Sequence, residues 1–197
     1  MEIMWLFLGL GLGIPGMAQG DESKLETATF AGGCFWCVEQ VFDEVEGVVK
    51  TTSGYIGGSQ KNPTYREVSR GKTGHAEAVE VVFDPAKVSY DELLAIYWRN
   101  IDPTTPDRQF CDRGSQYRAE IFYHNDEQLN LAQASLSALM EEKPFDGAIV
   151  TQITPASDFY PAEAYHQNFH RTNPLRYTFY KSRCGRDNRL EELWGKK

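Results

Sequence analysis

The sequence predicts an α+β fold: a two-layer α/β sandwich with a mixed, mostly antiparallel sheet and a long irregular C-terminal tail. Short segments with alternating apolar and polar residues, such as 77–83, are typical of strands in a sheet with one buried face. Other segments carry apolar residues at helical spacing, which favours helices packed on that face. The length of 197 residues and the hydrophobic content of 41% suit one domain with a sizeable core.

Local sequence patterns predict where the individual strands and helices lie. The first strand, 27–31, ends at a glycine pair, and apolar residues from Cys37 to Val45 then recur at helical spacing. A later helix begins at Ser89, where Glu92 completes a capping box. The other predicted elements are an extended segment at 48–56, a short helix at 64–69, strands at 77–83 and 117–123, a helix capped by Asn125, and a strand at 150–154. Residues 101–114 are predicted as a loop, and the tail as irregular apart from a short helix at 162–171.

The N-terminus indicates export. Residues 4–14 form a short apolar, glycine-rich run, and a small-x-small cleavage pattern follows at 16–18. We therefore expect a signal peptide at 1–18, a solvated linker at 19–26 and a single catalytic domain at 27–197, which places the protein in the periplasm or elsewhere outside the cytoplasm. The first residues carry Glu2 and no Lys or Arg, so an uncleaved anchor and a cytoplasmic location stay open.

Charge and cysteine content narrow the function further. The formal net charge of -8, without a basic cluster, argues against nucleic acid as a partner. Four scattered cysteines (Cys34, Cys37, Cys111 and Cys184) fit redox or catalytic use better than a disulfide scaffold.

Cys34 is the leading candidate for a nucleophile. It follows Gly32 and Gly33 and falls in the first turn of the predicted helix, where unpaired backbone amides and the helix dipole favour negative charge. Such a position lowers a thiol pKa and supplies thiolate. The neighbouring Phe35 and Trp36 offer an apolar, aromatic surface to another molecule.

Strand parity selects a partner for this thiol. Glu77 shares one strand face with Val79 and Val81, so its carboxyl lies at or near the core edge. Burial raises a carboxyl pKa and makes a proton donor near neutral pH, although Glu77 at the strand end could also reach water. Tyr117 shares a face with Ile121 in the same way, where core filling is its simplest role. An Asx turn is the simplest role for Asp112 in its loop.

Two other functions compete with this assignment. The Cys34–Cys37 pair, one helical turn apart, could belong to a general thiol-disulfide oxidoreductase of thioredoxin type. The same cysteines could join His166 and His170, four residues apart, in a Cys2His2 zinc site that stabilises a binding module. The long separation between the two pairs disfavours zinc, and we expect no metal.

Several motifs together resemble the A-type peptide methionine sulfoxide reductases, and the resemblance covers the chain from about Thr27 onward. Those motifs are Gly-Cys-Phe-Trp-Cys at 33–37, Gly-Tyr-Ile-Gly-Gly at 54–58, Asn-Pro-Thr-Tyr at 62–65, Gly-His-Ala-Glu at 74–77, Asp-Arg-Gly-Ser-Gln-Tyr-Arg at 112–118 and Tyr-His-Gln at 165–167. The resemblance implies an enzyme that reduces the S epimer of methionine sulfoxide, free or in proteins, and thereby repairs oxidative damage. It also implies an α/β sandwich without a metal or nucleotide cofactor.

The resemblance also assigns roles. Cys34 resembles the family's nucleophile and Glu77 its proton donor to the sulfoxide oxygen. Tyr65 and Tyr117 resemble the hydroxyls that bind this oxygen, and Asp112 a supporting polar residue. The aromatic pair at 35–36, Phe35 and Trp36, resembles the pocket for the substrate methyl group.

The implied cycle oxidises Cys34 to a sulfenic acid, which a second cysteine converts to a disulfide. Many family members use cysteines of a mobile C-terminal tail and have glycine where this chain has Cys37. We expect Cys184 to resolve the sulfenic acid, with Cys37 the next candidate and Cys111 a third. The implied reductant is an external thioredoxin-type protein, and we expect a monomer.

Overall fold

The computed structural model describes Met1 and residues 24–196. The expected signal segment and most of the linker therefore lie outside the described residues. Within the described part of the chain, no helix combines the length and the hydropathy needed to cross a membrane.

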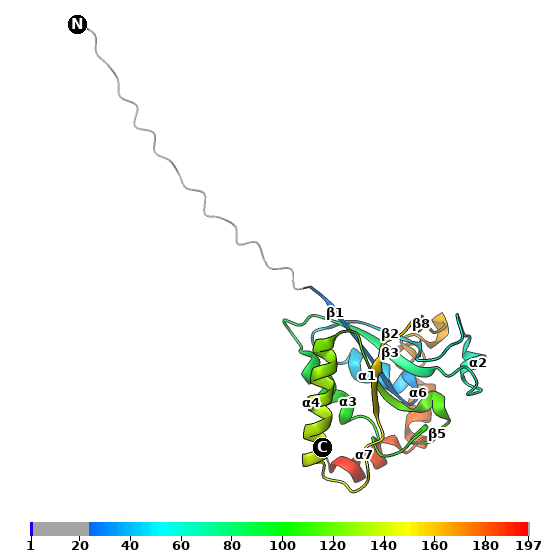
Figure 1. Cartoon of the computed structure of the whole chain (residues 1–197). Coiled ribbons are helices and arrows are strands. Elements are labelled where there is room, and N and C mark those ends of the chain that lie inside the picture. The colour runs from blue at the N-terminus through cyan, green and yellow to red at the C-terminus, as the bar shows by residue number, and fades with distance from the viewer. Residues whose placement is uncertain (2–23, 197) are drawn as a thin grey trace.

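One six-stranded sheet organises the domain (Figure 1). Its strands, in spatial order, are β7 (Gln152–Pro155), β6 (Ala119–Tyr123), β1 (Glu26–Gly32), β3 (Ala76–Phe83), β2 (Val48–Ile56) and β8 (Tyr160–Pro161). Neighbouring strands are antiparallel except for the parallel β6–β7 pair. The mixed, mostly antiparallel sheet expected from the sequence is thus confirmed.

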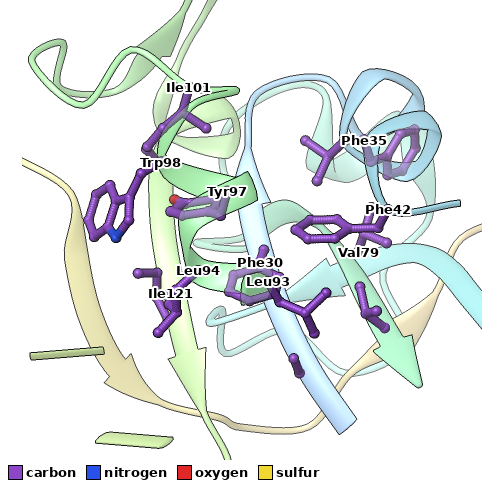
Figure 2. Close-up of a cluster of buried hydrophobic side chains, with 14 of the residues drawn as sticks. Phe30, Phe35, Phe42, Val79, Leu93, Leu94, Tyr97, Trp98, Ile101 and Ile121 are labelled. Carbon is purple, nitrogen blue, oxygen red and sulfur yellow. The ribbon is translucent and has the colours of Figure 1, made fainter. Parts of the chain in front are cut away.

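Helices α1 (Phe35–Asp43), α3 (Tyr90–Trp98) and α4 (Asp126–Glu142) pack beside this sheet and bury its main apolar face. Figure 2 shows the centre of this layer, where Phe30 of β1 faces Phe42 of α1 and Tyr97 of α3. The ring centroids of Phe30 lie 4.9 Å from Phe42 and 5.1 Å from Tyr97. Each fully buried apolar side chain stabilises the fold by about 1.5–3 kcal/mol, so this cluster fixes α1 firmly on the sheet.

The predicted capping signals are present. The Ser89 hydroxyl accepts a hydrogen bond from the Glu92 amide, and the Glu92 carboxylate accepts one from the Ser89 amide. Asn125 caps α4 by accepting from the Gln128 amide at 2.9 Å. The predicted strand at 117–123 begins two residues later than expected, because Tyr117 closes a 3-10 turn, η1 (Ser115–Tyr117). The predicted loop contains a small hairpin, β4 (Arg108–Gln109) and β5 (Asp112–Arg113).

The C-terminal tail differs from the sequence-based expectation. It contains η2 (Ala164–His166), α5 (Phe169–Thr172), α6 (Pro174–Arg183) and α7 (Arg186–Trp194). The single helix predicted over 162–171 is broken because Asn168 adopts a left-handed backbone with φ of 51°. Pro174 starts α6 at a position that proline tolerates, and left-handed Gly185 separates α6 from α7.

The tail also completes the sheet edge at β2. Strand β8 pairs only with Gly54 and Tyr55. One residue earlier, the Gln167 side chain accepts from the Ser53 amide and donates to the Ser53 carbonyl, both at 2.9 Å. The tail therefore folds against β2, the neighbour of the strand β3 that carries Glu77.

Candidate active site around Cys34 and Glu77

Cys34 lies at the junction of β1 and α1, as the sequence predicted. It occupies the N-cap of α1, directly after Gly33, whose φ of 87° suits glycine. A Cβ at Gly33 would come within 2.6 Å of the Gln109 Cβ, so the loop can pack here only against glycine. The Cys34 side chain is buried, with 8% of its surface exposed.

Glu77 meets the same junction from β3. Its carboxyl is 1% exposed, and its Oε2 accepts a hydrogen bond from the Phe35 amide at 3.1 Å. Burial, with a smaller contribution from the charge of Asp112, raises the pKa of Glu77 to about 8 against the opposing effect of the Phe35 hydrogen bond. The parity argument is confirmed, and the alternative in which Glu77 reaches water is not.

The pKa of the Cys34 thiol shifts opposite to expectation. Burial, followed by a hydrogen bond with Cys37, raises the pKa of Cys34 well above its ordinary value. The amide at the helix start does not face the thiol, because Phe35 N–H donates to Glu77. The first amide of the helix therefore binds the Glu77 carboxyl rather than the Cys34 sulfur.

The pKa of Cys37 shifts in the opposite direction to that of Cys34. A hydrogen bond from Cys34, together with the positive charges of Arg186 and Lys181, lowers the pKa of Cys37 to about 6. At neutral pH the two cysteines therefore share one proton, which Cys34 donates toward the Cys37 sulfur. Cys37 is also packed against Phe169 and Tyr177.

Tyr65, Tyr117 and Asp112 join this centre from three other segments. Tyr65 begins α2 (Tyr65–Val68), Tyr117 ends η1 and Asp112 begins β5. Burial and then the charge of Glu77 raise the pKa of Tyr65 to about 12 and that of Tyr117 further. Both tyrosines also feel the charges of Cys34 and Asp112, so all the predicted catalytic residues gather at one place. Both hydroxyls keep their protons at neutral pH and can donate hydrogen bonds.

The two aromatic residues after Cys34 are held by the tail. Phe35 is buried, with its ring centroid 5.1 Å from His166 and 6.4 Å from Tyr65. Trp36 stacks on Phe169 at 3.8 Å, and its Nε1 donates to Nδ1 of His166 at 3.0 Å. These contacts fix the orientation of both rings beside the thiol.

Sequence reasoning missed three residues that support the site. Glu163 accepts hydrogen bonds from the Tyr65 amide and the Tyr55 hydroxyl, each at 2.9 Å, which anchors the start of α2. Tyr180 donates to the Asp112 carboxylate and lies edge-on to Trp36. Arg186 supplies charge near Cys37. All three come from the tail, and no local pattern signals contacts across such separations.

Cys111 and Cys184 form a disulfide in this structure, while Cys34 and Cys37 are free. The disulfide joins the end of α6 to the residue before Asp112, and the Cys184 sulfur lies 3.9 Å from the Asp112 carboxylate. Cys184 is therefore not a free thiol here, and its role as resolving cysteine stays a prediction.

The zinc alternative is not favoured by the arrangement of its residues. His166 binds Trp36, whereas His170 lies 3.3 Å from Asp43. Among the described residues, the only cluster with metal-ligand spacing is Cys111, Asp112 and Cys184, and its two sulfurs are bonded to each other.

A model of the family described as peptide methionine sulfoxide reductase matches residues 26–197. The chain belongs to this family. It is 52% identical to the peptide methionine sulfoxide reductase MsrA of Bacillus licheniformis over 174 residues, which are 88% of this chain and 96% of that protein. The chain is accordingly a peptide methionine sulfoxide reductase that reduces methionine sulfoxide and repairs oxidised methionine, and neither alternative function is favoured.

Solved structures of the family share the fold. Methionine sulfoxide reductase A of Corynebacterium diphtheriae is 37% identical, with a TM-score of 0.69 over 81% of this chain and 80% of that one. Reduced Mxr1 from Saccharomyces cerevisiae is 31% identical, with a TM-score of 0.73 over 78% of this chain and 88% of that one. Mxr1 has also been solved in complex with Trx2, where the TM-score is 0.53, the identity 24% and the coverage 76% of this chain and 87% of that one.

Proposed function

We propose that Cys34 attacks the sulfur of S-epimer methionine sulfoxide while Glu77 protonates its oxygen. The observation that carries this assignment is the buried Glu77 carboxyl, bonded to the amide of the residue after Cys34 at 3.1 Å. With a pKa of about 8, this carboxyl is protonated at neutral pH and can act as a general acid. The Cys37 thiolate takes the Cys34 proton as the attack proceeds.

The other residues around the thiol bind the oxygen and the methyl group of the substrate. Tyr65 and Tyr117 donate hydrogen bonds to the sulfoxide oxygen, and Asp112 supports them. Phe35 and Trp36 receive the methyl group of the substrate against their aromatic faces. The substrate sulfur is reduced by two electrons and released as methionine, while Cys34 gains the oxygen as a sulfenic acid.

Cys37 resolves this sulfenic acid in our scheme. Its sulfur is hydrogen-bonded to Cys34 in the reduced enzyme, and after the first step it holds the proton that Cys34 gave up, which can pass to the sulfenic oxygen. Attack on the Cys34 sulfur forms the Cys34–Cys37 disulfide, and the sulfenic oxygen leaves as water after protonation. This choice differs from the sequence-based preference for Cys184, whose sulfur is bonded to Cys111 in the structure.

A disulfide map tests this scheme. Oxidised by one equivalent of methionine sulfoxide without reductant, the enzyme is expected to release one methionine and to contain a Cys34–Cys37 linkage by peptide mass spectrometry. Cys37→Ser is expected still to release one methionine, more slowly because the base for the Cys34 proton is missing, and to form no linkage. A map that joins Cys34 to Cys184 instead would refute Cys37 as the resolving residue.

We propose that a thioredoxin-type protein reduces the oxidised enzyme. We also propose that the enzyme has no bound cofactor, is a monomer and does not bind nucleic acid. The solved complex of Mxr1 with Trx2 supports this choice of reductant by analogy. We also propose one catalytic domain at 27–197, exported by a signal at 1–18 that is followed by a linker at 19–26. Sequencing the mature N-terminus tests the export signal, and measuring the molar mass by light scattering tests whether the enzyme is a monomer.

A further inference from the structure

A cavity of about 540 Å³ lies behind the catalytic helix, next to Cys37. It lies between α1, the end of α3 and the tail helices α6 and α7. It is lined by Cys37 and Val41 of α1, Asn100 after α3, Leu190 and Trp194 of α7, and several charged side chains. Neither Cys34 nor Glu77 lines it, so this space approaches the cysteine pair without passing the substrate residues. Its volume falls within the range typical of small-molecule sites.

The cavity is lined by more positive than negative charge. Four cationic side chains, those of Arg99, Lys181, Arg186 and Lys196, face two carboxylates, those of Asp187 and Glu191. Glu191 and Lys196 pair with each other at 3.5 Å, which leaves Arg99, Lys181 and Arg186 with the single carboxylate of Asp187.

Arg186 is the most informative of these cations. It is only 4% exposed, it donates to the Asn100 carbonyl at 2.6 Å, and its guanidinium lies 4.4 Å from the Phe110 ring centroid. Within the described part of the chain, no carboxylate lies within ion-pair distance of it. A buried charge is costly without a counterion, and in the reduced enzyme the charges of both Cys37 and Asp112 interact with Arg186.

Oxidation removes the Cys37 charge and leaves only that of Asp112. Once Cys37 enters a disulfide it carries no charge, and Arg186 and Lys181 are left facing a cavity with an excess of positive charge. The oxidised enzyme therefore favours an anion in this space more strongly than the reduced enzyme does.

We propose that the cavity binds a low-molecular-weight thiol bearing a carboxylate, and that this thiol reduces the Cys34–Cys37 disulfide by attack on Cys37. The inference rests on the proposed recycling through Cys37. It adds a second route of reduction, on the side of α1 away from the substrate.

Two thiol–disulfide exchange steps reduce the enzyme. The ligand thiolate bonds to the Cys37 sulfur, the Cys34–Cys37 bond breaks, and Cys34 leaves with the electron pair and takes a proton from water. A second ligand thiolate attacks the ligand sulfur of this mixed disulfide, and Cys37 leaves as a thiolate facing Arg186 and Lys181. Two thiols become one disulfide, and the enzyme gains two electrons.

The experiment compares thiols of matched size and different charge. Enzyme oxidised by methionine sulfoxide is treated with mercaptoacetate, 2-mercaptoethanol or cysteamine, and loss of the Cys34–Cys37 peptide linkage is followed by mass spectrometry. Rates are expressed per thiolate. We expect mercaptoacetate to react about tenfold faster than 2-mercaptoethanol, and cysteamine to be the slowest.

Two variants of α6 test whether the preference for mercaptoacetate depends on a cation that lines the cavity. Lys181→Gln is expected to reduce the mercaptoacetate advantage at least threefold, whereas Arg183→Gln, a change of the same charge on the exposed side of α6, leaves it intact. Cys34→Ser treated with the symmetric disulfide of mercaptoacetate is expected to carry the label on Cys37. This labelling needs no turnover.

The outcomes separate this inference from the proposed function. Absence of the first methionine, or of the Cys34–Cys37 linkage, would overturn the proposed function and this inference with it. Normal methionine and linkage with equal rates for the three thiols would overturn the inference alone. An equal effect of Lys181→Gln and Arg183→Gln would do the same.

Discussion

The acid role of Glu77 makes a sharp prediction for Glu77→Gln. At pH 7 a carboxyl with a pKa of about 8 is ~90% protonated, whereas one with the usual pKa of 4.5 is ~0.3% protonated. Burial on β3 thus increases the available acid roughly 300-fold. Glutamine keeps the size and a hydrogen-bond donor but cannot transfer a proton, so we expect the first-turnover rate constant to fall about 10²–10³-fold.

Rapid-quench measurement of methionine formation in a single turnover is the assay, since it is independent of recycling. In the wild type, the rate constant should rise with pH through about 6, as Cys37 loses its proton, and fall above about 8, as Glu77 does. In Glu77→Gln the rate constant should still rise with pH through about 6 but should no longer fall above about 8.

Glu80→Gln is the matched control. Glu80 is half-buried on the same strand, on the opposite side from Glu77, and should react like the wild type. The reasoning would be refuted by a Glu77→Gln rate constant within threefold of the wild type, or by an unchanged fall above pH 8.

Two further predictions concern the helix that carries the thiol. Cys34→Ser should release no methionine while keeping the wild-type circular dichroism spectrum; turnover by this variant would exclude Cys34 as the nucleophile. Glu39 of α1 is fully buried, and burial raises its pKa to about 7. Because the folded-state pKa lies above the usual 4.5, its stabilising contribution is complete below pH 4.5 and is lost as pH rises through 7. Glu39→Gln should therefore exceed the wild type in unfolding free energy by up to about 3 kcal/mol at pH 8.5 but show no gain at pH 4. Urea unfolding at both pH values tests this, and an equal gain at both would contradict it.

The positions of Cys34 and Glu77 could be predicted because they depend on local sequence patterns. Alternation along β3 was enough to bury Glu77, and the glycine pair followed by helical spacing was enough to place Cys34 at a helix start. The capping residues Ser89 and Asn125 marked two helix starts correctly.

The tail could not be predicted in the same way. Helix α6 buries only Tyr177, and its neighbour α7 contributes few buried apolar residues, so neither carries a clear apolar stripe. Their positions depend on contacts with distant partners, such as Tyr180 with Asp112, 68 residues away. The direction of the Cys34 pKa was predicted wrongly because the fold buries the thiol, and because the first helix amide donates instead to Glu77, 42 residues from Phe35.

Closure of the β2 edge by the Gln167 amide has a consequence for an enzyme that repairs damaged proteins. Oxidised polypeptides are often partly unfolded, and an unpaired strand edge is a template on which such chains add as further strands and aggregate. The side chain of Gln167 occupies both backbone groups of Ser53 just beyond the two-residue strand β8. The Ala162 amide also donates to the Ser53 carbonyl, at 2.8 Å, so Gln167 and Ala162 together protect this end of the sheet from the unfolded chains that the enzyme encounters.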